Sequence, residues 1–151
     1  MKATIVWFNG PSRQDLIKSF PLQETEIGCN YIRRDRPVQH VVCFDDGMVK
    51  QNNKILEPGV QYYTRDAYQK PPWKVVHKWG TVDPQNSGMM ALSLATQISG
   101  DPIYILGLDW GISTESVYTY RHRESPRKYT NSSQRQLRIL AEKFKIIVVN
   151  D

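Results

Sequence analysis

The chain has 151 residues, of which 40% are hydrophobic and 23% charged, an ordinary composition for one domain over residues 1–151. No apolar run approaches the roughly 20 residues that a membrane-spanning helix needs, and the first residues lack a signal-peptide pattern, so we expect a cytoplasmic protein with no membrane partner. The formal net charge of +5 is usually explained by a solvated basic surface, and an anionic small molecule or a nucleic acid is the alternative explanation.

The predicted elements alternate between strands and helices. In chain order, the hydrophobic pattern predicts a strand at 3–8, a helix at 12–19, strands at 24–28 and 38–44, a helix at 48–55, strands at 59–64 and 73–77, a helix at 88–98, a strand at 103–108, a helix at 133–144 and a strand at 146–149. The strands are apolar at consecutive positions, as is typical of a sheet covered on both faces. The sequence therefore predicts an α/β fold, a three-layer Rossmann-like sandwich with a mainly parallel central sheet.

Sheets of this kind bind ligands in the crevice beyond the carboxyl ends of their strands. Glycine and polar residues follow four of the predicted strands, at 9–12, 28–30, 45–47 and 107–110. Because the carboxyl ends of parallel strands share one edge, we expect the ligand site where these four segments meet.

The first of these segments reads Asn9-Gly10-Pro11-Ser12. Gly10 allows a tight turn and a close approach of a ligand, Pro11 suits the first turn of a helix, and Ser12 adds a hydroxyl beside helix N–H groups that favour anions. A plain strand-to-helix turn uses the same residue types, so both interpretations stay open. The segment is neither GxGxxG nor a Walker loop, so NAD is not expected as a cofactor.

Two adjacent carboxylates, Asp45 and Asp46, follow the predicted strand at 38–44. Like charges side by side favour a nearby cation or hydrogen-bond donors, which makes the pair a candidate site for Mg²⁺ or for a ribose hydroxyl. The alternative is an Asp-Asp-Gly turn in which one carboxylate caps the following helix.

Small polar residues also open the predicted helix at 88–98. Asn86, Ser87 and Gly88 can hold a base, a sugar or a phosphate, and plain helix capping explains them equally. Asp109 follows the strand at 103–108, where an aspartate either contacts a ligand or fixes the loop.

The basic residues fall into clusters that predict either a solvated surface or contacts with an anion: Arg33, Arg34, Arg36, Arg121, Arg123, Arg127, Lys128, Arg135 and Arg138. Nucleic acid is the weaker alternative, because no nucleic-acid-binding motif accompanies the charge. His122 lies among these arginines, which lower its basicity. We therefore expect a solvated loop histidine there, and no residue stands out as a general base.

The cysteines and histidines show no metal-ligand spacing. Cys29 and Cys43 are not a CxxC pair, and we expect buried, reduced thiols. His40, His77 and His122 are scattered, so a structural zinc site is not expected.

Together, these segments resemble two related protein families. The order NGPS, CN after a short strand, Asp after a valine-rich strand, NSG opening a helix, and IYILGLDW is similar to that of the bacterial sialyltransferases of lipooligosaccharide synthesis. It is also similar to the archaeal family of 6-hydroxymethylpterin diphosphokinases and flagellin-glycosylation-associated proteins. The likeness spans residues 3–110, with a weaker match at 132–149, and Asn86–Trp110 is its most specific stretch.

The resemblance implies a domain that binds a nucleotide or nucleotide sugar and transfers a glycosyl or diphosphate group. It implies that Asn9, Gly10 and Ser12 face the nucleotide or diphosphate, that Asn30, Ser87 and Gly88 line the donor pocket, and that Asp45, Asp46 and Asp109 match aspartates of these families. If the protein is an enzyme, we expect these aspartates to hold Mg²⁺ or orient hydroxyls, and Arg121, Arg123 or Lys128 to neutralise the leaving group.

The chain departs from the sialyltransferases before its last helix. Their catalytic histidine has no counterpart, because Lys128, Tyr129 and Thr130 occupy that region and His122 comes several residues earlier. This departure argues against sialyl transfer. The alternative to an enzyme is a non-catalytic protein that binds nucleic acid or a protein partner through the basic loop of Arg121, His122, Arg123 and Lys128.

Overall fold

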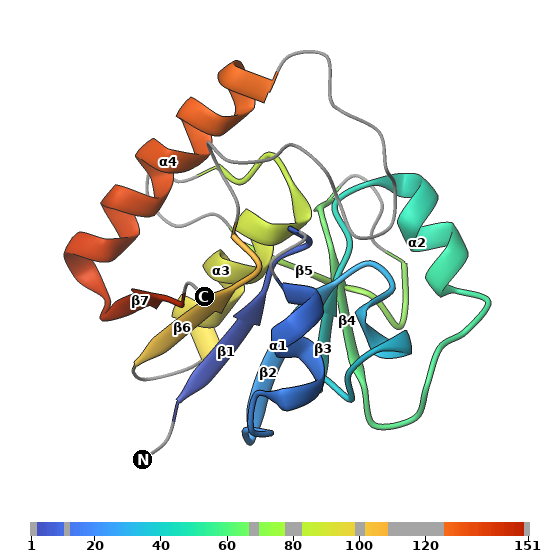
Figure 1. The fold of residues 1–151 in the computed structure, drawn as a ribbon. Coiled ribbons are helices and arrows are strands. Elements are labelled where there is room, and N and C mark those ends of the chain that lie inside the picture. The colour runs from blue at the N-terminus through green and yellow to red at the C-terminus, as the bar shows by residue number, and fades with distance from the viewer. Residues whose placement is uncertain are drawn as a thin grey trace.

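The computed structural model describes residues 3–10, 13–66, 70–77, 83–98, 102–108 and 126–149, with side chains from residue 132 onward in the last helix. These residues form, in chain order (Figure 1), β1 (Thr4–Trp7), α1 (Arg13–Ser19), β2 (Thr25–Cys29), a 3₁₀-helix η1 (Ile32–Arg34), β3 (His40–Val42), α2 (Asp46–Asn52), β4 (Gln61–Thr64), β5 (Lys74–Val75), α3 (Ser87–Ile98), β6 (Ile103–Leu106), α4 (Pro126–Lys143) and β7 (Ile146–Val148). Among the described helices, none has the length and apolar character needed to cross a membrane.

The described strands form one parallel sheet in the order β5-β4-β3-β2-β1-β6-β7 (Figure 1). β1 lies inside the sheet, where Val6 is in register with Ile27 of β2 on one side and with Ile105 of β6 on the other. The chain runs outward from β1 to β5 and then returns to β6 beside β1. The topological switch point, where such sheets bind ligands, therefore falls between β1 and β6.

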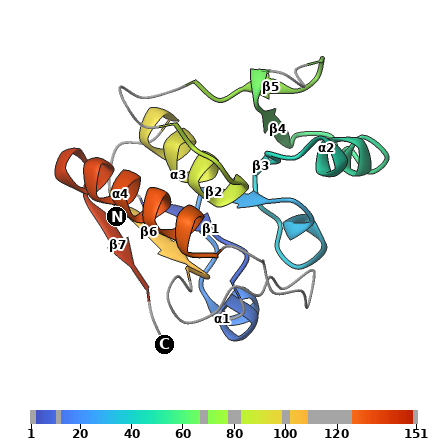
Figure 2. The same cartoon turned by 90° about the horizontal axis from the view of Figure 1, so that it is seen from above.

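Helices cover both faces of this sheet (Figure 2). Side chains along β1 alternate between two buried clusters, with Ile5 and Trp7 in one and Val6 and Phe8 in the other. The first cluster includes side chains of α1, η1 and α2, and the second includes side chains of α3 and α4. The fold is a three-layer α/β sandwich with a parallel sheet, which confirms the fold class predicted from the sequence.

Several element boundaries differ from the prediction. α2 spans Asp46–Asn52 where 48–55 was expected, and β5 spans Lys74–Val75 where 73–77 was expected. β3 is confined to His40–Val42, within the predicted range 38–44, because only these residues are in register with β2 and β4. α4 begins at Pro126, well before the predicted start at 133. A proline is well suited to the first position of a helix, where a missing N–H leaves no hydrogen bond unmade.

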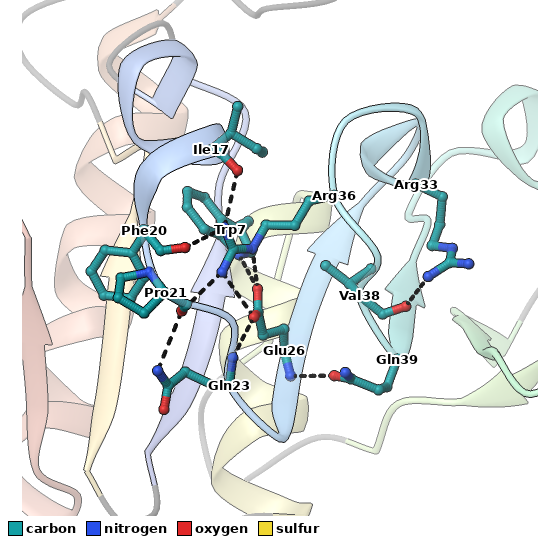
Figure 3. Close-up of polar contacts among 10 residues, drawn as sticks. All are labelled: Trp7, Ile17, Phe20, Pro21, Gln23, Glu26, Arg33, Arg36, Val38 and Gln39. Atoms are coloured by element: carbon teal, nitrogen blue, oxygen red, sulfur yellow. Dashed lines mark hydrogen bonds and ion pairs between the residues drawn. The ribbon is translucent and has the colours of Figure 1, made fainter.

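A buried ion pair ties β2 to the segment that follows η1 (Figure 3). Glu26 and Arg36 are 1% and 3% exposed, and both carboxylate oxygens of Glu26 accept hydrogen bonds from the Arg36 guanidinium. The same carboxylate accepts hydrogen bonds from Trp7 Nε1 and from the Gln23 backbone N–H, each at 2.8 Å. The Glu26 charge is thus surrounded by donors inside the molecule.

Arg36 also binds the backbone carbonyls at the C-terminal end of α1. Its guanidinium donates to the carbonyls of Ile17, Phe20 and Pro21 at 3.0, 2.8 and 3.1 Å (Figure 3). Carbonyl oxygens at a helix C-terminus favour a positive charge. The expectation of a basic surface cluster is therefore wrong for Arg36, which has an internal structural role.

Cys29 is the last residue of β2 and Cys43 directly follows β3, the neighbouring strand, but their side chains lie on opposite faces of the sheet. Cys29 belongs to the cluster on the α3 side and Cys43 to the cluster on the α1 side, and both thiols are buried and outside any disulfide. A disulfide needs Cβ atoms about 4 Å apart that point toward each other, so this arrangement cannot form one. The expectation of buried, reduced thiols is confirmed.

We expect neither thiol to react with DTNB at pH 8 while the protein is folded, because the thiolate is the reactive species. Burial raises the pKa of Cys29 to about 12, and burial also raises the pKa of Cys43. About one Cys29 side chain in 10,000 would then be a thiolate at pH 8. In concentrated urea, both cysteines of the chain should react at once. Fast reaction of the folded protein, or less than full reaction after unfolding, would contradict this arrangement.

Candidate functional site

The carboxyl ends of the parallel strands lie at one edge of the sheet (Figure 1), and that edge carries those sequence-predicted site residues that the structure describes. They are Asn9, Gly10, Asn30, Asp45, Asp46, Asn86, Ser87 and Gly88. Pro11, Ser12, Asp109, Arg121, His122 and Arg123 lie outside the described residues, as does the side chain of Lys128. Their expected roles, including the basic loop as a nucleic-acid or protein contact, stay predictions.

The loop after β1 crosses the switch point to the end of β6. Gly10 N–H donates to the Gly107 carbonyl at 2.8 Å, so this N–H is already used and Gly10 serves to shape the turn. Asn9 Oδ1 accepts a hydrogen bond from Arg13 Nη1 at 2.9 Å, and the same nitrogen donates to the Phe8 carbonyl at 3.3 Å. The orientation of the Asn9 amide follows, because a guanidinium can only donate.

A second set of contacts connects the ends of β2 and β3 to the start of α3. The Phe44 backbone N–H donates to Ser87 Oγ at 2.9 Å, and the Ser87 hydroxyl donates to Asn30 Oδ1 at 3.3 Å. Asn30 has a φ of 57°, a left-handed conformation that asparagine adopts more readily than most residues. Asn30 and Ser87, both proposed as site residues from the sequence, are therefore in direct contact.

Asn86 caps α3, as the plain structural interpretation of this segment expects. Its Oδ1 accepts a hydrogen bond from Met89 N–H at 2.9 Å, the standard N-cap contact. Its Nδ2 donates to Ser133 Oγ of α4 at 3.1 Å. Both ends of the Asn86 amide are thus engaged within the protein, which leaves little for a ligand.

The first turn of α3 packs directly on β1. A Cβ on Gly88 would lie 2.5 Å from the Phe8 ring, so this approach requires glycine. Ser87 and Gly88 are buried, and within the described part of the chain their backbone N–H groups have no hydrogen-bond partner. The helix therefore presents two N–H donors at the carboxyl edge of the sheet, where its dipole favours negative charge.

The two aspartates lie at the start of α2. Asp45 occupies the N-cap position without a side-chain capping bond, and Asp46 forms an ion pair with Lys50 at 2.9 Å. Among the described residues, no three His, Cys, Asp or Glu side chains gather closely enough to hold a metal ion. These two carboxylates do not by themselves supply a Mg²⁺ site, and Mg²⁺ stays a prediction from the sequence.

Arg13 is a site residue that sequence reasoning did not single out. It is the first residue of α1 and only 1% exposed, and besides Asn9 and Phe8 its guanidinium faces Asp35 at 3.5 Å. A cation in the first turn of a helix is disfavoured by the helix dipole. That unfavourable placement, directly after the Asn-Gly-Pro-Ser segment, is the sequence signal that points to Arg13.

Among the described residues at this edge, the internal hydrogen bonds of the two asparagine side chains engage their oxygen atoms and not their NH₂ groups. Asn9 Oδ1 faces Arg13, and Asn30 Oδ1 faces the Ser87 hydroxyl. In the described structure, no hydrogen bond engages Nδ2 of Asn9, Nδ2 of Asn30, or the N–H groups of Ser87 and Gly88. A row of donors is suited to a ligand rich in acceptor oxygens, such as a phosphate or a sugar.

Comparisons with known proteins do not assign the chain to a family. No protein-family model, no curated protein and no solved structure matches it. The resemblance to the sialyltransferase and pterin diphosphokinase families therefore rests on sequence motifs alone. Because three-layer parallel folds serve many unrelated functions, function has to be argued from the site.

Proposed function

We propose that this protein binds a nucleotide or nucleotide sugar at the carboxyl edge of its sheet and transfers a group from that activated phosphate compound. The binding step is supported by the geometry of the edge, and the transfer step by the resemblance to the two transferase families. In open α/β sheets, ligands bind at the switch point, which here lies between β1 and β6, next to Asn9.

The proposal rests on the kind of hydrogen-bonding group at this edge, because the groups that face a ligand are donors. Asn9 and Asn30 are each held by their amide oxygen, so each offers its NH₂ group, and both residues are partly exposed. The N–H groups of Ser87 and Gly88 add donors from the start of α3. Phosphate oxygens and sugar hydroxyls accept such bonds, and the helix dipole strengthens those made to an anion.

Replacing Asn30 by aspartate should weaken nucleotide binding by roughly tenfold or more, because a charge-assisted hydrogen bond is lost and a negative charge is added. Aspartate keeps an oxygen for the Ser87 hydroxyl and tolerates a φ of 57°. Thermal unfolding would be measured with CMP, CDP, UDP, GDP, ATP and CMP-sialic acid, each with and without Mg²⁺. A ligand at 100 times its Kd should add about 2.7 kcal/mol, or roughly 5–10 °C in Tm.

Asn53→Asp is the matched control for this experiment. Asn53 lies at the C-terminal end of α2, and its Oδ1 accepts a hydrogen bond from Trp73 Nε1 at 2.7 Å. The substitution makes the same chemical change and keeps the same kind of acceptor, away from the proposed site. Wild-type protein that is stabilised by none of these compounds would refute the proposal. Equal binding by the Asn30→Asp and Asn53→Asp variants would remove Asn30 from the site.

A further inference from the structure

Phe44 and Arg65 form a cation–π pair beyond the ends of β3 and β4. The guanidinium carbon of Arg65 lies over the Phe44 ring, 4.5 Å from its centroid, which is a cation–π distance. Arg65 is exposed, whereas Phe44 is partly buried against the cluster on the α3 side of the sheet. The pair thus places a guanidinium group in contact with an aromatic ring at the edge that carries the candidate site.

This pair is joined to the donor row by hydrogen bonds. The Phe44 N–H binds Ser87 Oγ, and the Ser87 hydroxyl binds Asn30. Asn9, Asn30, Phe44 and Arg65 follow β1, β2, β3 and β4, which are successive neighbours in the sheet. Neighbouring strands are about 4.8 Å apart, so the Phe44–Arg65 pair lies roughly 10–14 Å along the edge from the end of β1.

We propose that the base of a bound nucleotide stacks on Arg65, with its phosphate end toward Asn30, Asn9 and the switch point. This inference rests on the proposed function and narrows it, because a ligand without a base, such as a phosphosugar, would make no stacking contact with Arg65. Guanidinium planes stack on the faces of nucleobases, and such stacking tolerates different bases because every base has a π-face. A planar group already held by Phe44 loses less side-chain freedom when a base stacks on it.

A second arginine–aromatic pair provides a matched control. The guanidinium carbon of Arg34 lies 4.6 Å from the Tyr31 ring centroid, and Arg34 is also exposed. Arg34 lies in η1 and Tyr31 directly precedes it. Ile32 of η1 packs in the cluster on the α1 side, whereas Phe44 packs on the α3 side and contacts Ser87. Removing Arg34 deletes the same charge and the same kind of ring contact without touching the proposed base site.

The test compares Kd values by titration calorimetry for base-bearing and base-free probes. CMP, UDP, GDP and ATP carry a base, whereas ribose 5-phosphate and inorganic pyrophosphate do not. Arg65→Ala should raise the Kd of the nucleotides by at least about fivefold, which is the lower end of the measured contribution of base stacking. The same substitution should change the Kd of the base-free probes by less than about twofold. Arg65→Lys keeps the charge but not the plane and should also weaken the nucleotides. Arg34→Ala should bind all probes like wild type.

The remaining outcomes separate this inference from the proposed function. If nucleotides bind in an Asn30-dependent way but Arg65→Ala binds them like wild type, base stacking on Arg65 is wrong and the proposed function survives. If Arg65→Ala weakens pyrophosphate as much as the nucleotides, Arg65 acts through its charge and the stacking proposal is wrong. If wild-type protein binds neither class of probe, both proposals are refuted.

Discussion

Replacing Arg36 by methionine should lower the free energy of unfolding by about 3–5 kcal/mol, because the Glu26 carboxylate stays buried without its counter-charge. Of its partners among the described residues, Glu26 would keep the N–H groups of Trp7 and Gln23, and the carbonyls at the end of α1 would lose the Arg36 donor. Domains of this kind are stable by about 5–15 kcal/mol, so the change removes a large share of the total. Urea denaturation followed by circular dichroism measures it.

Lys50→Met is the control for Arg36→Met, since it breaks the exposed Asp46–Lys50 pair, whose side chains are 43% and 73% exposed. An exposed pair of this kind on a helix contributes about 0.3–0.5 kcal/mol, and lysine and methionine have similar helix propensities. Adding Glu26→Gln to Arg36→Met should restore part of the lost stability, because the uncompensated charge is then absent. An Arg36→Met effect as small as that of Lys50→Met would contradict the structural role of the buried pair.

The layer architecture could be predicted from the sequence because its signals are local. Consecutive apolar residues at 38–44 indicate a strand that is covered on both faces of the sheet. Helical spacing of the apolar residues in 88–98 indicates a helix between strands, and neither pattern depends on residues that are distant in sequence. The boundaries were less accurate. The length of β3, His40–Val42, is set by pairing with β2 and β4, and such pairing does not appear in a local pattern.

The roles of charged residues could not be predicted in the same way. Arg33, Arg34 and Arg36 are neighbours in sequence, yet Arg36 turns inward to Glu26 while Arg33 pairs with Glu57 and Arg34 lies over Tyr31. The tertiary fold determines which residue each of these arginines contacts. A count of adjacent basic residues therefore overestimates the basic surface at η1.

The candidate site was predictable in position but not in detail. Asn30 and Ser87 are 57 residues apart and are in contact, as expected if both lie at the carboxyl edge of parallel strands. Which atoms remain for a ligand depends on internal hydrogen bonds that the sequence does not reveal. The Gly10 N–H binds the Gly107 carbonyl, while within the described part of the chain no hydrogen bond engages the NH₂ groups of Asn9 and Asn30.

Replacing Gly107 by alanine should lower the free energy of unfolding by about 2–5 kcal/mol and also weaken ligand binding at the carboxyl edge. Its φ of +79° is unfavourable for a residue with a Cβ, and that Cβ would lie 2.6 Å from the Phe8 carbonyl oxygen and 3.0 Å from Arg13 Cβ. To relieve these contacts, the end of β1 must shift relative to β6. That shift disturbs the hydrogen bond from the Gly10 N–H to the Gly107 carbonyl. Urea denaturation and the nucleotide thermal-shift series measure the two effects.

Two other glycines separate the causes of the Gly107→Ala effect. Gly59 has a φ of +81° but open space around its would-be Cβ, so Gly59→Ala should show the backbone strain alone, about 1–2 kcal/mol. Gly47 lies within α2, has a φ outside the left-handed region and meets nothing within 4 Å, so Gly47→Ala should raise the stability by about 0.5–1 kcal/mol. Only Gly107→Ala should reduce ligand binding. If Gly107→Ala costs no more than Gly59→Ala, the close contact between β1 and β6 does not constrain the fold. If binding then also stays at the wild-type level, the switch point is not part of the ligand site.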